Sequence, residues 1–164
     1  MLLNFLTGAL AVYSNAFIAL LSNHHIWIAA LACVSAQALK VLIEYGRTKK
    51  IDKVLLFSTG GMPSSHSALV VALAASIGTI EGLYSPLFAI AIVSALVVMY
   101  DAAGVRRAAG KQAEVINLLM ERLESIGITP DRKLKELLGH SPIEVVAGAI
   151  WGILTSTVAH GVLG

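Results

Sequence analysis

Four long stretches of this sequence contain no Asp, Glu, Lys or Arg: residues 1–39, 54–80, 82–100 and 145–164. A helix that spans a bilayer needs about 20 mostly apolar residues, which each stretch supplies. The chain of 164 residues is only 13% charged, whereas soluble domains average roughly 25%. A soluble fold would need a much larger polar shell around this apolar material. The sequence therefore predicts an all-α integral membrane protein that forms one domain over residues 1–164.

Turns and charged residues divide the chain into five predicted transmembrane segments. They cover residues 2–21, 26–45, 63–80, 86–103 and 142–160. The N-terminus lacks the basic residues of a signal peptide, so we expect the first segment to be retained. A polar region at 104–141 contains amphipathic helical patterns at 110–125 and 130–138. We expect this region to lie at the membrane interface or to form a dimer contact.

The basic residues lie on one side of this predicted topology. With five crossings, the N-terminus and both long loops share one side, and the short turns and the C-terminus share the other. All 12 Lys and Arg residues then fall on the first side, which the positive-inside rule makes cytoplasmic. A four-crossing variant, with the first segment in the interface, would move only the N-terminus. The net charge is only +2, and no nucleic-acid partner is expected.

The run GGMPSSHSA at residues 60–68 combines a glycine turn with the predicted start of the third segment. The glycines permit a tight turn and the close approach of a ligand, and Pro63 suits the first helical position. A helix N-terminus offers unpaired N–H groups and the positive end of its dipole to an anion. Ser64, Ser65 and His66 lie in this first turn. A plain serine-rich helix cap explains the same residues equally well.

Three further polar clusters fall at the same membrane face. Lys40 and Arg47 are seven residues apart and share a helical face, as do His140 and Glu144, which are four apart. The third cluster consists of Asp101, Arg106 and Arg107. Charged groups at membrane depth are costly and usually functional. Two histidines, several cations and a helix N-terminus are the groups needed to transfer a phosphoryl group without a metal.

The motifs in these clusters resemble those of type 2 phosphatidic acid phosphatases and vanadium haloperoxidases. The matching residues are Lys40-x6-Arg47, Pro63-Ser64-Ser65-His66 and the pair His140 and Glu144. The longer blocks GGMPSSHSA, YDAAGVRR and GHSPIE are similar more specifically to the divergent PAP2 family of small bacterial and plastid membrane proteins. The resemblance covers residues 26–155 and implies a PAP2-like helical bundle.

The resemblance also implies a reaction and a set of residue roles. The reaction is hydrolysis of a lipid or isoprenoid phosphate monoester at the cytoplasmic face, without a cofactor. His140 is the expected nucleophile that becomes a phosphohistidine, Glu144 orients it, and His66 is the general acid and later the base. The other expected site residues hold the phosphate or support those that do: Lys40, Arg47, Ser64, Ser65, Arg106, Arg107, Asp101 and Gly61.

Four positions depart from the superfamily motifs. Thr48 replaces a proline, Ser65 a glycine, Leu134 an arginine and Glu144 an aspartate. Arg106 or Arg107 is the expected source of the missing guanidinium. The departures at Thr48, Ser65 and Leu134 favour the alternative function, a non-catalytic membrane protein that binds or transports a phosphorylated lipid. A purely structural membrane protein without a ligand is the third hypothesis.

Simpler interpretations remain open for several of these residues. Ser141-Pro142-Ile143-Glu144 fits a capping box with proline at the first helical position. Lys40 and Arg47 also fit side chains that extend to lipid headgroups, and Arg106 and Arg107 fit topology determinants. A metal site would draw on His66, Asp101, His140 and Glu144, whose spacing matches no standard zinc motif.

Two features lie outside this cluster. His24, His25 and His160 fall on the opposite side of the predicted membrane, and we interpret them as incidental. Gly148-x3-Gly152 in the last segment is a weak signal for helix contact, which makes a homodimer an expectation.

Overall fold

The computed structural model describes residues 17–49, 61–126, 134 and 139–163, and these residues contain helices and no strand. The helices are α2 (His24–Thr48), α3 (Ser65–Glu81), α4 (Pro86–Ala103), α5 (Val105–Glu124) and α6 (Pro142–Leu163). They match four of the five predicted segments and the first amphipathic pattern, so the all-α class is confirmed. The first predicted segment lies mostly outside the described residues, and so does the second amphipathic pattern apart from Leu134.

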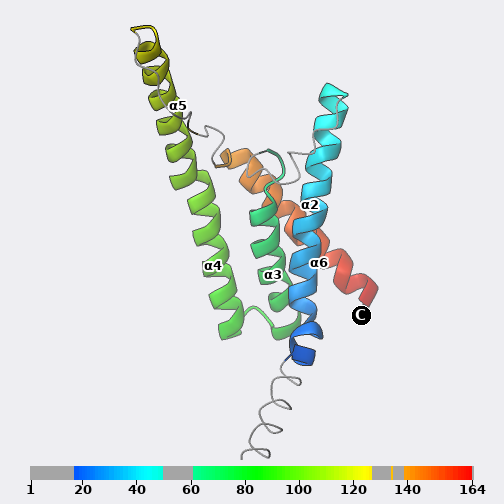
Figure 1. Cartoon of the computed structure of the whole chain (residues 1–164). Coiled ribbons are helices and arrows are strands. Elements are labelled where there is room, and N and C mark those ends of the chain that lie inside the picture. Colours follow the sequence, from blue (N-terminus) through cyan, green and yellow to red (C-terminus); the bar gives the residue numbers. More distant parts are fainter. Residues whose placement is uncertain (1–16, 50–60, 127–133, 135–138, 164) are drawn as a thin grey trace, which may run out of the picture.

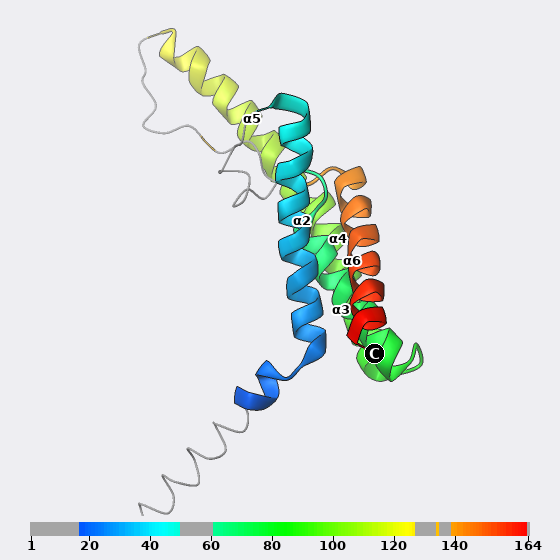
Figure 2. The same ribbon diagram turned by 90° about the vertical axis from the view of Figure 1, so that its right-hand side faces the viewer.

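Within the part of the chain that the structure describes, three helical stretches are long and apolar enough to cross a membrane: α2, the run Pro86–Glu124 that contains α4, and Pro142–Val162 of α6. The apolar helix α3 has 17 residues, at the short end of the roughly 17–25 residues that span a bilayer. The amphipathic helix α5 continues from α4 beyond the end of the bundle (Figures 1 and 2). Gly104 separates α5 from α4.

Helix α3 lies at the centre of the bundle and contacts α2, α4 and α6 (Figure 1). The shared core is built mainly from small side chains on α2, α3 and α6: Ile28, Ala32, Ala36, Ala68, Ala72 and Ala159, with Trp151 packed against them. Lipid tails are as apolar as these side chains, so burial alone gives little drive for helix association in a bilayer. Close backbone approach and van der Waals contact hold such helices together instead.

Two glycines bring α6 against the backbone of α3. A Cβ atom at Gly148 would collide with the carbonyl oxygen of Ser64, and one at Gly152 would lie 2.5 Å from that of Ala68. Any larger residue would therefore force the two helices apart. The helix contact predicted for Gly148-x3-Gly152 is therefore made within the chain, between α6 and α3, and it gives no support to a contact with a second copy.

Candidate functional site

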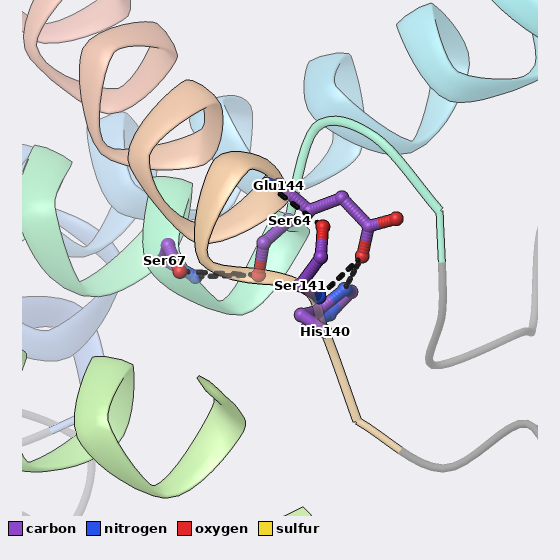
Figure 3. Close-up of polar contacts among 5 residues, drawn as sticks. All are labelled: Ser64, Ser67, His140, Ser141 and Glu144. Atoms are coloured by element: carbon purple, nitrogen blue, oxygen red, sulfur yellow. Dashed lines mark hydrogen bonds and ion pairs between the residues drawn. The ribbon is translucent and has the colours of Figure 1, made fainter. Parts of the chain in front are cut away.

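His140 and Glu144 interact at the start of α6 (Figure 3). His140 Nδ1 lies 3.2 Å from Glu144 Oε2, which also accepts from the Ser141 N–H at 3.0 Å. In return, the Ser141 hydroxyl accepts from the Glu144 N–H at 3.4 Å, which completes a capping box. The cap and the orientation of His140 thus use the same carboxylate. Because an ionised carboxylate only accepts, we assign the proton to Nδ1 and the lone pair to Nε2.

The His140 imidazole is buried, with 3% of the residue exposed. Its Nε2 has no hydrogen-bond partner among the residues that the structure describes. Its backbone N–H donates to the Ala102 carbonyl at 3.0 Å, which fixes the residue against the end of α4. Burial lowers the pKa of His140, although the hydrogen bond with Glu144 acts in the opposite direction. The neutral, nucleophilic form is therefore favoured at neutral pH.

His66 lies in the first turn of α3 and is exposed. Its ring centroid is 6.3 Å from that of His140, and the ring planes are inclined by 57°. A phosphate that hydrogen-bonds to two imidazoles can span up to about 12 Å, from the usual donor–acceptor distances. The two histidines are therefore close enough to act on one phosphate.

A cavity of about 270 Å³ opens next to Glu144. It is lined by Lys40, Ile43, Glu44, Arg47, Gly61, Met62, Ser141, Ile143 and Glu144. Lys40 is buried and Arg47 is exposed, so one cation lies at depth and the other lies nearer the surface. Neither His66 nor His140 is among the lining residues. Glu144 connects the cavity with the histidine pair, because its side chain borders both.

The turn before α3 covers the buried Lys40. Gly61 has a backbone φ of +91°, and a Cβ atom there would lie 3.2 Å from Lys40 Cδ. The positive φ favours glycine at this position, and an added Cβ would also press against the Lys40 side chain. The close approach predicted at Gly61 is therefore an approach to Lys40 in this structure.

Ser64, rather than Pro63, marks the start of α3. The Ser64 side chain is the N-cap and accepts from the Ser67 N–H at 3.3 Å and the Ser67 hydroxyl at 3.1 Å (Figure 3). Pro63 precedes this cap, so its assignment to the first helical position was wrong; that position belongs to Ser65, which is buried. The Ser64 N–H donates to the Glu144 carbonyl at 3.0 Å and ties the serine turn to α6.

The third predicted cluster lies at the end of α4. Asp101 is half-buried in the last turn of that helix, next to Ala102, whose carbonyl holds His140. Arg106 and Arg107 lie in the first turn of α5, and the Arg107 side chain is exposed and does not line the cavity. The structure does not describe the side chain of Arg106.

Leu134 stands where the superfamily motif has an arginine, and the structure fixes its backbone. The buried Asn117 side chain on α5 donates to the Leu134 carbonyl and accepts from its N–H, each at 2.8 Å. The Leu134 residue is 43% exposed. Sequence reasoning missed Asn117. It lies on the side of α5 that carries the buried Ala113, away from the exposed Leu118 and Leu119, so the apolar pattern of this helix gave no signal for it.

The residues that the structure describes include no group of three or more His, Cys, Asp or Glu that could hold a metal ion. The alternative metal site, built from His66, Asp101, His140 and Glu144, is therefore not formed in this arrangement.

The helices, the serine turn and the buried motif residues define a multi-pass, all-helical membrane protein with the PAP2-like motifs gathered at one end. The chain belongs to the Divergent PAP2 family, which it matches over residues 21–155. It is similar to the uncharacterized membrane protein YuiD of Bacillus subtilis (strain 168), with 44% identity over 150 residues, or 85% of this chain and 95% of YuiD. No solved structure matches the chain.

Proposed function

We propose that this protein is a metal-independent phosphatase that hydrolyses a lipid or isoprenoid phosphate monoester. The observation that carries the proposal is the histidine pair. His140 has a lone pair on a buried, unpartnered Nε2 within the described residues, and the ring of His66 lies 6.3 Å away. The first can attack phosphorus while the second transfers a proton. Family membership supports a phosphatase-related role.

In the first step, the lone pair of His140 Nε2 forms a bond to phosphorus, and the bond between phosphorus and the ester oxygen breaks. The protonated ring of His66 gives its proton to the leaving oxygen, so that the alcohol departs neutral. Glu144 stabilises the positive charge that develops on the His140 ring through the bond to Nδ1. The product is a phosphohistidine.

In the second step, water attacks the phosphohistidine. His66, now neutral, accepts a proton from this water, and the bond between phosphorus and Nε2 breaks. Inorganic phosphate leaves, and both histidines return to their starting protonation states. Each step keeps its charges within a partly buried site, where fixed charges and dipoles act strongly.

The cations lie where phosphate oxygens can be held while the ester tail remains in the bilayer. Lys40 and Arg47 line the cavity beside Glu144 and belong to a membrane-spanning helix. The concentration of basic residues near this end of the bundle supports a cytoplasmic site. A homodimer remains compatible with this arrangement, without a role for Gly148.

One observation favours the second candidate, a protein that binds or transports a phosphorylated lipid without hydrolysing it. The cavity that contains Lys40 and Arg47 is lined by neither histidine, and His140 Nε2 is shielded from solvent. A phosphate held by both cations would have to move, or the site would have to open, before Nε2 reached phosphorus. The leucine at position 134 also leaves the motif without its usual guanidinium.

The test is phosphate release by the purified protein from a panel of lipid and isoprenyl phosphates in the presence of EDTA. We expect turnover that His140→Ala and His66→Ala abolish, and a phosphohistidine that can be trapped only when His140 is present. His24→Ala is the matched control, because this histidine is exposed at the other end of the bundle. Binding of lipid phosphate without release would establish the second candidate, and loss of turnover in EDTA would contradict the metal-free mechanism.

A further inference from the structure

Three polar residues from three helices form a hydrogen-bonded chain at the end of the bundle remote from the candidate site. Ser76 on α3 is fully buried. Its Oγ lies 2.7 Å from Nδ1 of His25 on α2 and 3.0 Å from Nε2 of His160 on α6. Ser76 is roughly three turns along α3 from the serine turn. The interpretation of these two histidines as incidental therefore does not account for their shared partner.

The Ser76 hydroxyl determines which protonation states of His25 and His160 allow both hydrogen bonds to form. A hydroxyl donates one hydrogen bond and accepts others. If one imidazole donates to Oγ, the hydroxyl proton is free to donate to the other imidazole, which must be neutral at that nitrogen. Both bonds then form. If both imidazoles are protonated, both must donate to Oγ, and the hydroxyl proton can no longer be donated to either of them and must turn to a backbone carbonyl of α3.

Double protonation also places two positive charges around one buried oxygen. The other Asp, Glu, His or Tyr groups described at this end of the bundle are His24 on α2, Glu81 on α3 and Tyr84 in the following turn. The described part of α6 carries Glu144 in its first turn and His160 as its other titratable residue. Glu144 lies at the far end of that helix. Neither His25 nor His160 forms a salt bridge with a carboxylate of the described residues, so distance and solvent offset the repulsion between the two charged rings.

We propose that His25, Ser76 and His160 form an acid-sensitive latch that joins α2, α3 and α6. The latch is closed while at least one of the two histidines is neutral. It opens when both are protonated, because the hydroxyl then donates to neither imidazole and the two positive charges favour separation of the helices. Acidification drives this change, because imidazole is the side chain that gains a positive charge as the pH falls below neutral.

The latch acts on the same helix that carries the candidate site. Helix α6 begins beside Glu144 and contains His160 near its end. Between them, the Trp151 indole donates to the Ser35 hydroxyl on α2 at 2.9 Å. Opening of the latch therefore removes one tie of α6 to α2 and α3, while this bond, the core packing and the contacts nearer the site remain. Trp151 reports on whether that part of α6 moves.

The first test compares the thermal unfolding of the purified full chain in detergent at about pH 8 and about pH 5. In the double variant His25→Asn with His160→Gln, side-chain amides replace the two bonded ring nitrogens and do not titrate in this range. We expect acidification to lower the Tm of the wild type by roughly 2–4 °C more than that of the double variant. His24→Asn, which changes the neighbouring exposed histidine, should retain the wild-type difference.

Equal losses of Tm in the wild type and the double variant would overturn the proposal. His66 and His140 are present in both proteins, so their titration cancels in the comparison. Ser76→Ala should lower the Tm at about pH 8, because both imidazoles lose their buried partner. An unchanged Tm in that variant would show that the hydrogen bonds of Ser76 with His25 and His160 do not hold the helices together, which would also contradict the latch.

The second test does not depend on the folding of the histidine variants. Trp27→Phe leaves Trp151 as the single tryptophan. Its emission should shift between about pH 8 and about pH 5 at a temperature at which the protein remains folded. An emission spectrum that stays constant across this range would mean that α6 does not move, and would likewise overturn the proposal.

Discussion

The carboxylate of Glu144 makes two interactions that matter to the candidate site. It caps the backbone at the start of α6 and holds the imidazole of His140 in one tautomer. A substitution at this position therefore affects the helix and the site together. Local patterns in the sequence predict the capping box and the shared helical face of His140 and Glu144, and the family resemblance implies that Glu144 orients His140. Local patterns do not reveal that burial shields the other ring nitrogen.

The pH dependence of activity follows from the environment of His140. Burial lowers the pKa of this imidazole in the folded protein, so its neutral form persists below the ordinary histidine range. We expect protonation of His140 to lower kcat/KM only below about pH 6.5. Near neutral pH, other groups should determine how kcat/KM depends on pH. Phosphate-release assays across the acid range measure this decrease in kcat/KM.

Acidification lowers the stability of the folded protein, just as it lowers activity, through His140. Its folded pKa is lowered, so the unfolded state binds more protons below about pH 6.5, and stability falls as the pH decreases through the folded pKa. His140→Asn removes this part of the pH dependence of Tm, whereas the latch variants remove a different part. If kcat/KM instead fell because a nucleophile became protonated above neutral pH, the assignment of His140 as that nucleophile would be contradicted.

At the scale of the elements, the contact between α3 and α6 decides how the site is assembled. The glycines of α6 allow its backbone to reach α3, and the Ser64 N–H then donates to the Glu144 carbonyl. The sequence predicts the helices well, since long apolar runs and caps are local signals. It does not identify the partner of Gly148, and it places Pro63 inside a helix that begins after it. The first error concerns a contact between segments far apart in the chain, and the second concerns a helix boundary that the Ser64 cap sets.

Gly148→Ala tests this contact. The added methyl group would meet the backbone of α3, which cannot move aside as a flexible side chain can. Overpacking of this kind costs about 1–3 kcal/mol, which corresponds to a loss in Tm of roughly 2–4 °C per kcal/mol for a chain of this size. Gly161→Ala is the matched control on the same helix, because a Cβ atom there has no neighbour within 4 Å. Equal Tm values for the two variants would contradict the close contact.

At the scale of the whole molecule, the distribution of charge relates the bundle to the membrane. Basic residues gather near the candidate site, and the opposite end has the histidine latch and an exposed turn. Charge counts predict such an orientation from the sequence alone, because they depend on totals rather than on contacts. The latch is different: its three members come from segments that only the fold brings together.

Cysteine labelling tests this orientation. Cys33 is the single native cysteine, so Cys33→Ser provides a background without thiols. We expect a membrane-impermeant thiol reagent applied to intact cells to label Tyr84→Cys, in the exposed turn after α3, but not Arg107→Cys on α5. Labelling of the Arg107→Cys variant alone would reverse the assignment of the cytoplasmic side.

The position of α3 at the centre of the bundle has a consequence for biosynthesis. The ribosome completes α3 before α6, yet α6 supplies the acceptor for the Ser64 N–H and one of the two partners of the Ser76 hydroxyl. Until α6 enters the bilayer, a short helix with incompletely paired polar groups must wait beside α2 and α4. A nascent chain truncated before α6 would expose that unfinished face, which makes insertion of the last helix the step that membrane chaperones and proteases are best placed to monitor.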